Sequence, residues 1–224
     1  MKRFTYSKEI ANTVKKFLEE DEWYYSFDEE RGIFEFGLRV KGKIRKIRYI
    51  VDIRETEILV YGICPIAVDY DDKEVMAQMA EFICRANFGL KNGGFEFDFN
   101  DGEIRYKSFI DCDGALPATE IIKNSIYCVA KMYDRYEKGI TDIIFGGGSA
   151  KKAVDMCEKT PEEELRSMLL EMGVDPGDGD IDSMLTRLEE SIDITDDDST
   201  DDTEASEEAP EVHFDLFDKK TEEE

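Results

Sequence analysis

Two carboxylates within residues 92–108, "NGGFEFDFNDGEIRYKS", are of a residue type that could do chemistry. Glu96 and Asp98 alternate with three phenylalanines, so both acidic side chains would leave an extended strand on the same side. Paired acids of this kind can bind a metal ion or provide a general base. A carboxylate that works as a base needs burial or a like-charge neighbour to raise its pKa.

The residues that follow these acids predict a structural role for them. An Asp-Gly pair at 101–102 favours a two-residue hairpin turn, which would place Asp98 opposite Arg105 and Glu96 opposite Lys107. Cross-strand pairs of opposite charge contribute about 0.2–1 kcal/mol each to the stability of a sheet. Because each acid gains a cationic partner on an exposed face, we interpret the two acids as the solvated side of a hairpin.

Other signatures of catalysis are weak in this sequence. The only histidine, His213, lies in an acidic C-terminal stretch where no folded base–nucleophile pair is expected. The glycine-rich "GGGSAKK" (146–152) has neither the spacing of a phosphate-binding loop nor that of a nucleophile elbow at Ser149. A helix that starts after glycines can bind an anion, but a flexible turn with Ser149 as N-cap is the plainer interpretation. We therefore expect no enzyme activity and no cofactor.

A calcium motif is the sharpest metal candidate. Four acids fall at positions 1, 3, 5 and 12 of an EF-hand loop, namely Asp178, Asp180, Asp182 and Glu189. Position 6, where the sharp turn normally needs glycine, is occupied by Ser183. The favoured alternative is that Asp180 caps a helix beginning near Ile181, because the helix dipole favours a negative charge there.

The end of the chain carries a better candidate for binding a partner. A short apolar cluster interrupts otherwise solvated acidic sequence and consists of Val212, Phe214, Leu216 and Phe217. Such a cluster is typical of a linear motif that becomes ordered on a protein partner. It could equally dock onto the sheet of its own domain, and an inert solubilising tail is the remaining alternative.

The charge of the chain is placed unevenly. Its formal net charge is −25 over 224 residues, yet residues 160–224 hold 25 Asp/Glu and 4 Lys/Arg, against 29 and 25 in residues 1–159. A chain this negative is a poor partner for nucleic acid or an anionic membrane, because phosphate binding depends on clustered Lys and Arg. The local exception is "KGKIRKIR" (41–48). Read as a strand, it splits its cations between two faces, with Lys43 and Arg45 on one side and Lys46 and Arg48 on the other, so a solvated strand is favoured over an anion or partner site.

Cysteine spacing and the N-terminus predict a cytoplasmic protein. The five cysteines (64, 84, 112, 128 and 157) are odd in number and widely spaced, which indicates reduced thiols instead of a disulfide or zinc framework. The first 16 residues contain no apolar run, so we expect neither a signal peptide nor a membrane span.

The elements that must position these residues follow from hydrophobic periodicity. Residues 1–159 predict an α+β domain, an antiparallel sheet with packed helices in the order α-β-β-β-β-α-β-β-α. Ser7, Asp71 and Thr119 are expected to cap helices, and Gly89 and Gly139 to end two of them. Strands are expected over 22–28, 32–40, 43–53, 57–66 and the hairpin. A helical appendage (160–192) and a disordered acidic tail (193–224) are expected to follow.

Residues 72–108 also carry a resemblance to a known family. An Asn-aromatic-Gly-Leu step leads into Phe-Glu-x-Asp and Asp-Gly-Glu-Ile-Arg-Tyr, a pattern that resembles the centre of the YbjN-like family. The matching residues are Asn87, Phe88, Gly89, Leu90, Gly94, Phe95, Glu96, Asp98, Asp101, Gly102, Glu103, Ile104, Arg105 and Tyr106. The resemblance covers about residues 1–158 and does not reach the appended helices or the tail.

The resemblance implies a fold similar to the small dimeric chaperones of type III secretion, and it supplies no catalytic residues. We therefore expect a non-enzymatic, chaperone- or adaptor-like domain, possibly a homodimer, that binds a protein or peptide partner in a groove. The appended helices and tail would add a partner site or occupy the groove. The alternative is a ligand-sensing regulator of stress or signal transduction, with a small-molecule pocket between helix and sheet.

Overall fold

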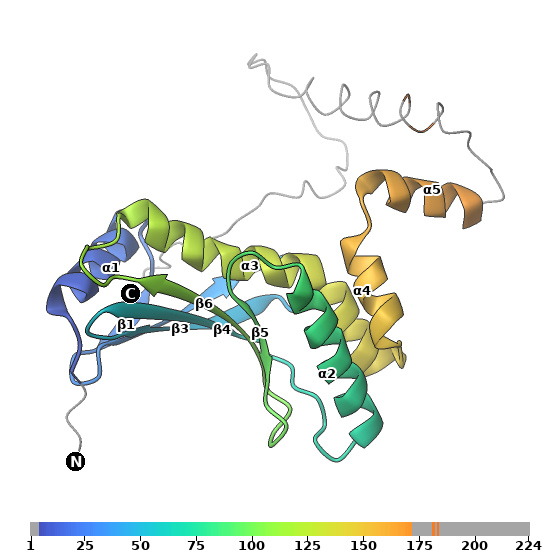
Figure 1. Cartoon of the computed structure of the whole chain (residues 1–224), viewed down its shortest axis with the longest axis horizontal. Helices are drawn as coiled ribbons and strands as arrows, with labels where there is room; N and C mark the ends of the chain where they lie inside the picture. Colours follow the sequence, from blue (N-terminus) through green and yellow to red (C-terminus); the bar gives the residue numbers. More distant parts are fainter. Residues whose placement is uncertain (1–4, 172–180, 182, 184–224) are drawn as a thin grey trace, which may run out of the picture. The chain divides into compact units, whose positions relative to one another are not determined.

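In this computed structural model, residues 5–171, 181 and 183 are described, and they form the predicted α+β fold (Figure 1). The elements in chain order are α1 (Lys8–Glu20), β1 (Tyr25–Asp28), β2 (Ile33–Arg39), β3 (Lys46–Ile53), β4 (Glu57–Ile63), α2 (Lys73–Phe88), β5 (Gly94–Phe97), β6 (Ile104–Asp111), α3 (Thr119–Thr141), the π-helical turn η1 (Asp142–Gly146), α4 (Ala150–Glu158) and α5 (Pro161–Glu171). The described residues divide into two compact units after Cys157, and each unit is described by itself.

The first unit is built on one antiparallel sheet of six strands in the order β1-β2-β3-β4-β6-β5. Helices α1 and α3 lie on one face of this sheet, and α2 packs beside the edge strand β5 (Figure 1). The hairpin of β5 and β6 follows α2 and inserts β6 next to β4, which leaves β5 at the edge. The predicted order of elements, including four strands in the first block, is therefore confirmed.

The helix ends confirm some of the predicted caps and correct others. The Ser7 side chain accepts a hydrogen bond from the Ile10 N–H and caps α1, as predicted. The N-cap of α2 is Asp72 instead of Asp71, because the Asp72 carboxylate is the one that accepts the free N–H groups of the first turn. Helix α3 begins at Thr119 after Ala118, so Thr119 is its first residue and not its cap.

The predicted end of α3 at Gly139 is wrong. The helix continues to Thr141 and then passes into η1, and Gly139 is buried within it. A Cβ atom at Gly139 would lie 2.5 Å from the Phe82 ring and 2.9 Å from the Cys157 sulfur. The glycine therefore permits α2 and α4 to approach α3 closely, and it does not terminate the helix.

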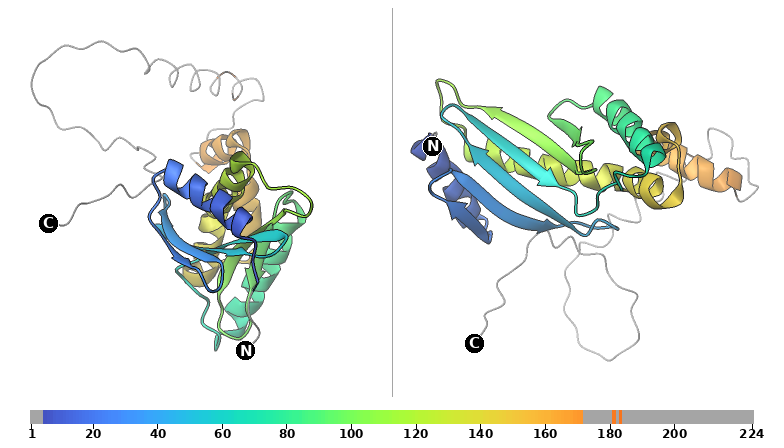
Figure 2. Two further views of the ribbon diagram at one scale, coloured as in Figure 1. Left: turned by 90° about the vertical axis from the view of Figure 1, so that its left-hand side faces the viewer. Right: turned by 90° about the horizontal axis from the view of Figure 1, so that it is seen from below.

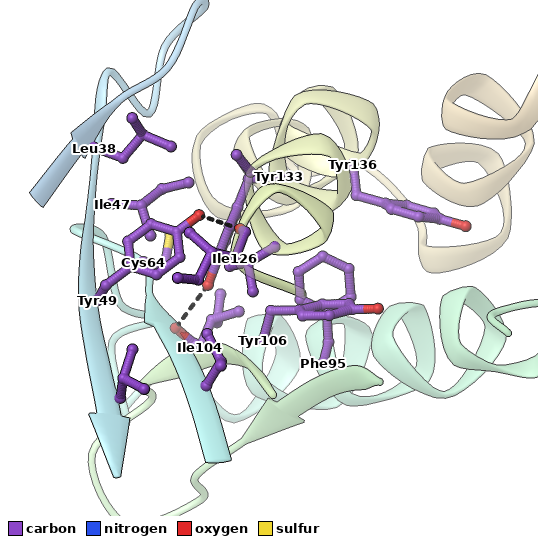
Figure 3. Close-up of a cluster of buried hydrophobic side chains, with 14 of the residues drawn as sticks. Leu38, Ile47, Tyr49, Cys64, Phe95, Ile104, Tyr106, Ile126, Tyr133 and Tyr136 are labelled. Carbon is purple, nitrogen blue, oxygen red and sulfur yellow. Dashed lines mark hydrogen bonds between the residues drawn. The ribbon is translucent and has the colours of Figure 1, made fainter. Parts of the chain in front are cut away.

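Buried tyrosines join α3 to the sheet (Figure 3). The Tyr133 hydroxyl lies 2.8 Å from the Gly62 carbonyl oxygen and 3.4 Å from that of Ile104, to which it donates. From the sheet side, the Tyr49 hydroxyl donates to the Ile126 carbonyl oxygen at 2.9 Å. Burial raises the pKa of both tyrosines, so both hydroxyls stay protonated and can act as donors.

A glycine on β4 brings α3 close to the sheet at the same place. A Cβ atom at Gly62 would clash with the Val129 side chain of α3. Strand β4 therefore needs a residue without a side chain at this position, because any other residue would push the helix away and separate the Tyr133 hydroxyl from its acceptors.

The hairpin register differs from the predicted one by two residues. Glu96 pairs with Arg105 and Phe97 with Ile104, whereas the two-residue turn predicted Asp98 opposite Arg105. The loop is longer because the Asp98 N–H donates to the Glu103 carbonyl and the Gly102 N–H to the Asp98 carbonyl. Gly102 has a φ of +74° and packs against the backbone of Val68. A shift of two residues keeps every strand side chain on its predicted face.

The basic stretch 41–48 is also corrected. Strand β3 begins only at Lys46, and Arg45, with a φ of +59°, lies with Lys43 in the preceding turn. The buried Ile44 anchors this turn to α3, because its N–H donates to the Glu137 carboxylate at 3.3 Å. Only Lys46 and Arg48 of this stretch project from the strand.

The edge of β5 is closed by a side chain. The Asn87 amide nitrogen donates to the Phe95 carbonyl, and the Asn87 amide oxygen accepts from the Phe95 N–H, both at 2.8 Å. Asn87 therefore binds the strand backbone as a neighbouring strand would, and it blocks pairing with another chain at this point.

The second unit contains α5. A capping box starts this helix: the Thr160 hydroxyl accepts from the Glu163 N–H at 3.2 Å, and the Glu163 carboxylate accepts from the Thr160 N–H at 2.9 Å. Pro161 at the first helical position completes this start signal.

We predict that Asn87→Ala lowers the free energy of unfolding by about 1–3 kcal/mol, because it leaves the partly buried N–H and C=O of Phe95 without partners. The matched control is Asn12→Ala, at an exposed position of α1 where substitutions usually change stability by no more than about 0.5 kcal/mol. Urea denaturation measures both, and an equal loss in the two variants would contradict the role of Asn87.

Candidate protein-binding face

The two faces of the sheet differ in what covers them. Strand residues alternate between buried side chains, such as Phe34, Val51 and Val60, and side chains that point to the other side. Seen from below, the strands lie in front of α3, on the side that the helices of the first unit leave uncovered (Figure 2). We call this second side of the sheet the open face.

An apolar strip crosses the middle of the open face. It consists of Ile50, Leu59, Tyr61, Ile63 and Phe109. The strand register makes these residues neighbours, because Ile50 is opposite Tyr61 and Leu59 is opposite Phe109. Phe109 is 50% exposed and the other four are half-buried. Apolar side chains that gather on an uncovered sheet face are typical of an interaction surface.

Charges of opposite sign lie at the two ends of the apolar strip. The basic end consists of Arg39, Lys46, Arg48, Arg105 and Lys107, and the acidic end of Asp52, Glu57 and Asp111. One cation belongs to the acidic end, because the Arg54 guanidinium lies 3.0 Å from the Asp52 carboxylate and 3.9 Å from that of Glu57. Arg39 is directly opposite Lys46, and Glu57 is directly opposite Asp111. Like charges opposite each other destabilise a sheet. Arg54 offsets part of this repulsion at the acidic end, where three acids still face one cation.

Glu96 holds part of the basic end in place. Its carboxylate binds the Arg105 guanidinium at 2.7 Å and also the Lys107 ammonium. Burial alone would raise the pKa of Glu96, but the hydrogen bonds from Lys107 and Arg105 outweigh it and hold this pKa below its usual value. Arg105 also lies over the Tyr61 ring, 4.8 Å from its centroid.

Two other cations of the basic end lack such a partner. Within the described part of the chain, Lys46 and Arg48 make no ion pair, although both are exposed. Acidic groups of a binding partner can therefore reach them without displacing an existing contact.

The structure separates the two acids with which the sequence analysis began. Glu96 lies on the open face, as predicted, although its cross-strand partner is Arg105. Asp98 instead belongs to the hairpin loop, where its carboxylate accepts from the Asn100 N–H at 2.8 Å. An open hollow of about 370 Å³ lies beside them, lined by Glu96, Phe97, Asp98, Glu103 and Arg105. Among residues 5–171, no three His, Cys, Asp or Glu side chains are placed to hold a metal ion.

The glycine-rich loop before α4 packs against Asp142. The N–H groups of Gly147 and Gly148 donate to the Asp142 carbonyl, and a Cβ atom at Gly148 would clash with the Asp142 carboxylate. Ser149 stands at the N-cap position of α4, as predicted, because its carbonyl accepts the Ala153 N–H at 3.0 Å. The Gln78 side chain accepts the Ala150 N–H at 2.8 Å. The loop is therefore a turn before α4, held by its contacts with Asp142, and the N–H groups of Gly147 and Gly148 are already used within it.

The remaining sequence candidates are only partly covered by the structure. Asp178, Asp180, Asp182 and Glu189 of the calcium motif, and Val212, Phe214, Leu216 and Phe217 of the tail, lie outside the described residues. The five cysteines are free thiols, as predicted, and burial raises the pKa of Cys64 to about 11.

The open face is not among the features predicted from the sequence, although β4 carries a signal for it. The run Ile58-Leu59-Val60-Tyr61 is apolar at consecutive positions, so both faces of this strand carry apolar side chains. A strand of an antiparallel sheet with one solvated face normally alternates apolar and polar residues. The departure at Leu59 and Tyr61 therefore indicated a second apolar surface.

Comparisons with known proteins are limited to a weak likeness in structure. No family model and no curated protein was found to match this chain. The crystal structure of the ExsC–ExsE complex is similar over 57% of this chain and 92% of that chain, with 14% sequence identity and a TM-score of 0.38. A likeness of this degree transfers no partner or activity. None of the helices in the described residues has the length and apolar character of a membrane span.

We predict that Glu96→Gln lowers the free energy of unfolding by about 0.2–1 kcal/mol at pH 7, the range of cross-strand charge pairs. Because folding lowers the pKa of Glu96, its contribution exists above the unfolded pKa of about 4.3 and is lost as the pH falls through the folded pKa. Urea denaturation from pH 7 to pH 3 should show the two stability curves converging below about pH 4. A difference that does not depend on pH would contradict the ion pairs.

Proposed function

We propose that this chain is a non-enzymatic protein-interaction domain, chaperone- or adaptor-like, that binds an extended segment of a protein partner on the open face. The observation that carries the proposal is the apolar strip between a basic and an acidic end, on the sheet face that the helices of the first unit leave uncovered. Apolar contacts would supply affinity, and the separated charges would fix the direction of the bound segment.

The size of the strip favours a segment over a folded partner. A stable interface between folded proteins buries about 1,200–2,000 Å² in total. The apolar strip consists of only five side chains. Phe109 is the exposed member, at 50% exposure, and the other four are half-buried. An extended peptide presents its side chains at alternate positions and matches the repeat of the strands beneath it.

The charged ends favour a partner with a complementary order of charges. Acids at the basic end would contact Lys46 and Arg48. Cations at the acidic end would add to the single positive charge of Arg54, which binds Asp52 and Glu57 there. Arg105, stacked on Tyr61, joins the charged and apolar parts of the face. Tyrosine and arginine are enriched among the residues that dominate binding energy at interfaces.

Binding by strand addition is the less favourable mode at the β5 edge. Asn87 already occupies both backbone groups of Phe95 there, so a partner strand would first have to displace it. The blocked edge supports binding through side chains on the face.

Membership of the YbjN-like family is part of this proposal. The roles of three matching residues support it: Asn87 closes the β5 edge, Gly102 permits the hairpin loop, and Arg105 binds Glu96. The alternative of a small-molecule pocket between helix and sheet gains no support from the packing, because Tyr49, Tyr133 and neighbouring apolar side chains fill that space (Figure 3).

We predict that Phe109→Ser reduces the amount of partner crosslinked to the full-length chain in its native cell at least five-fold, because Phe109 is the most exposed residue of the strip. The matched control is Ile121→Ser on α3, since Ile121 is also 50% exposed but lies off the open face. Quantitative mass spectrometry of the crosslinked material measures both variants. Equal recovery with the two variants, given equal thermal stability, would contradict the proposal.

A further inference from the structure

The two charged ends of the open face are a defined distance apart. The Arg39/Lys46 pair marks the basic end and the Glu57/Asp111 pair the acidic end. Strand β3 starts at Lys46, and the Arg54 N–H that follows the strand donates to the Glu57 carbonyl. Eight residues therefore separate the two pairs along the strand, or about 26 Å at 3.3 Å per residue.

The C-terminal sequence has the same three parts in the complementary order. Glu207, Glu208 and Glu211 come first, apolar residues follow at the alternate positions 212, 214 and 216, and Lys219 and Lys220 come next, before Thr221 and the three glutamates 222–224. From Glu211 to Lys219 is again eight residues, which is about 26 Å in an extended conformation. Acid, apolar strip and base in the segment therefore match base, apolar strip and acid on the face.

We propose that residues 211–220 of this chain bind along the open face, in the direction of β3, when no partner is present. The proposal rests on the proposed function, because the same face is used. Glu211 and the acids before it lie at the basic end, the side chains of Val212, Phe214 and Leu216 contact the apolar strip, and the two lysines lie at the acidic end. A partner must then displace the segment.

The length and tethering of the chain make this binding favourable. There are 53 residues between Cys157 and Glu211, enough to return to either side of the sheet. A tethered segment has an effective concentration in the millimolar range for short flexible linkers, decreasing with length. Even a weak contact is therefore populated in the full chain, and a partner with the same charge pattern competes with it.

A second copy of the chain is the competing occupant. A face that is basic at one end and acidic at the other can pair with itself about a two-fold axis. However, the strip of five side chains is small beside the apolar interface of an obligate homodimer, which buries about 2,000 Å² or more. The tethered segment is also available at any protein concentration, so we favour it.

Photocrosslinking in the full-length chain tests the proposal. A photoreactive phenylalanine analogue replaces Phe214 in one sample and Asp215 in a control, because neighbouring residues of an extended segment point to opposite sides. We expect position 214 to give crosslinks within single chains, to the peptides that contain Ile50, Tyr61 or Phe109, at a yield at least three times that of position 215.

Charge reversal provides an independent arm. Lys46→Glu with Arg48→Glu should lower the crosslink yield from position 214 at least three-fold, and so should Glu208→Lys with Glu211→Lys. The two reversals combined should restore at least half of the original yield, as expected when both sets of charges act on one contact. Both sheet positions are exposed, so thermal melting is expected to be unchanged.

Three results would overturn the proposal: crosslinks only in covalent dimers, which would indicate a second copy; crosslinks to α1 or α3; or reversals whose effects simply add.

If position 214 gives no crosslink while partner capture still depends on Phe109, only the binding of the chain's own segment is wrong. If capture does not depend on Phe109 but the crosslinks to the open face form, the proposed partner function is wrong and the segment is a permanent part of the fold.

Discussion

The contact between α3 and the sheet is the constraint on which the rest of the structure depends. The Tyr133 hydroxyl binds carbonyl groups of β4 and β6, the Tyr49 hydroxyl binds a carbonyl of α3, and Gly62 leaves space for Val129 between them. These bonds are buried, so losing one would leave a polar group without a partner in the core. They commit one face of the sheet to the helix, and because strand side chains alternate, they also fix which side chains remain on the other face.

The separation of positive and negative charge on the open face results from the register of four strands. Lys46 and Arg39 meet because β2 and β3 pair there, and Glu57 and Asp111 meet because β6 is inserted beside β4. The like charges at each end cost a little sheet stability. With apolar residues between its charged ends, this surface is suited to bind an extended segment in one direction only. Reversing the segment would bring like charges together.

Local signals in the sequence predicted the elements, and contacts between distant residues decided what the sequence missed. The order of elements, the Ser7 cap and the faces of the hairpin strands follow from periodicity and turn chemistry. The hairpin loop was mispredicted because Gly102 packs against Val68, and the end of α3 because Gly139 packs against Phe82 and Cys157. The open face could not be assembled from single strands, because Ile50, Tyr61 and Lys107 become neighbours only once three strands are aligned.

The most direct test of the central claim, that the open face is the binding surface, is to place a photoreactive residue at position 109 in one full-length chain and at position 121 in another. The two positions are equally exposed but lie on the open face and on α3, respectively. The account predicts that position 109 captures an extended segment, from a partner or from residues 211–220, and that position 121 captures none. Capture of a partner at position 121 with none at position 109 would contradict it.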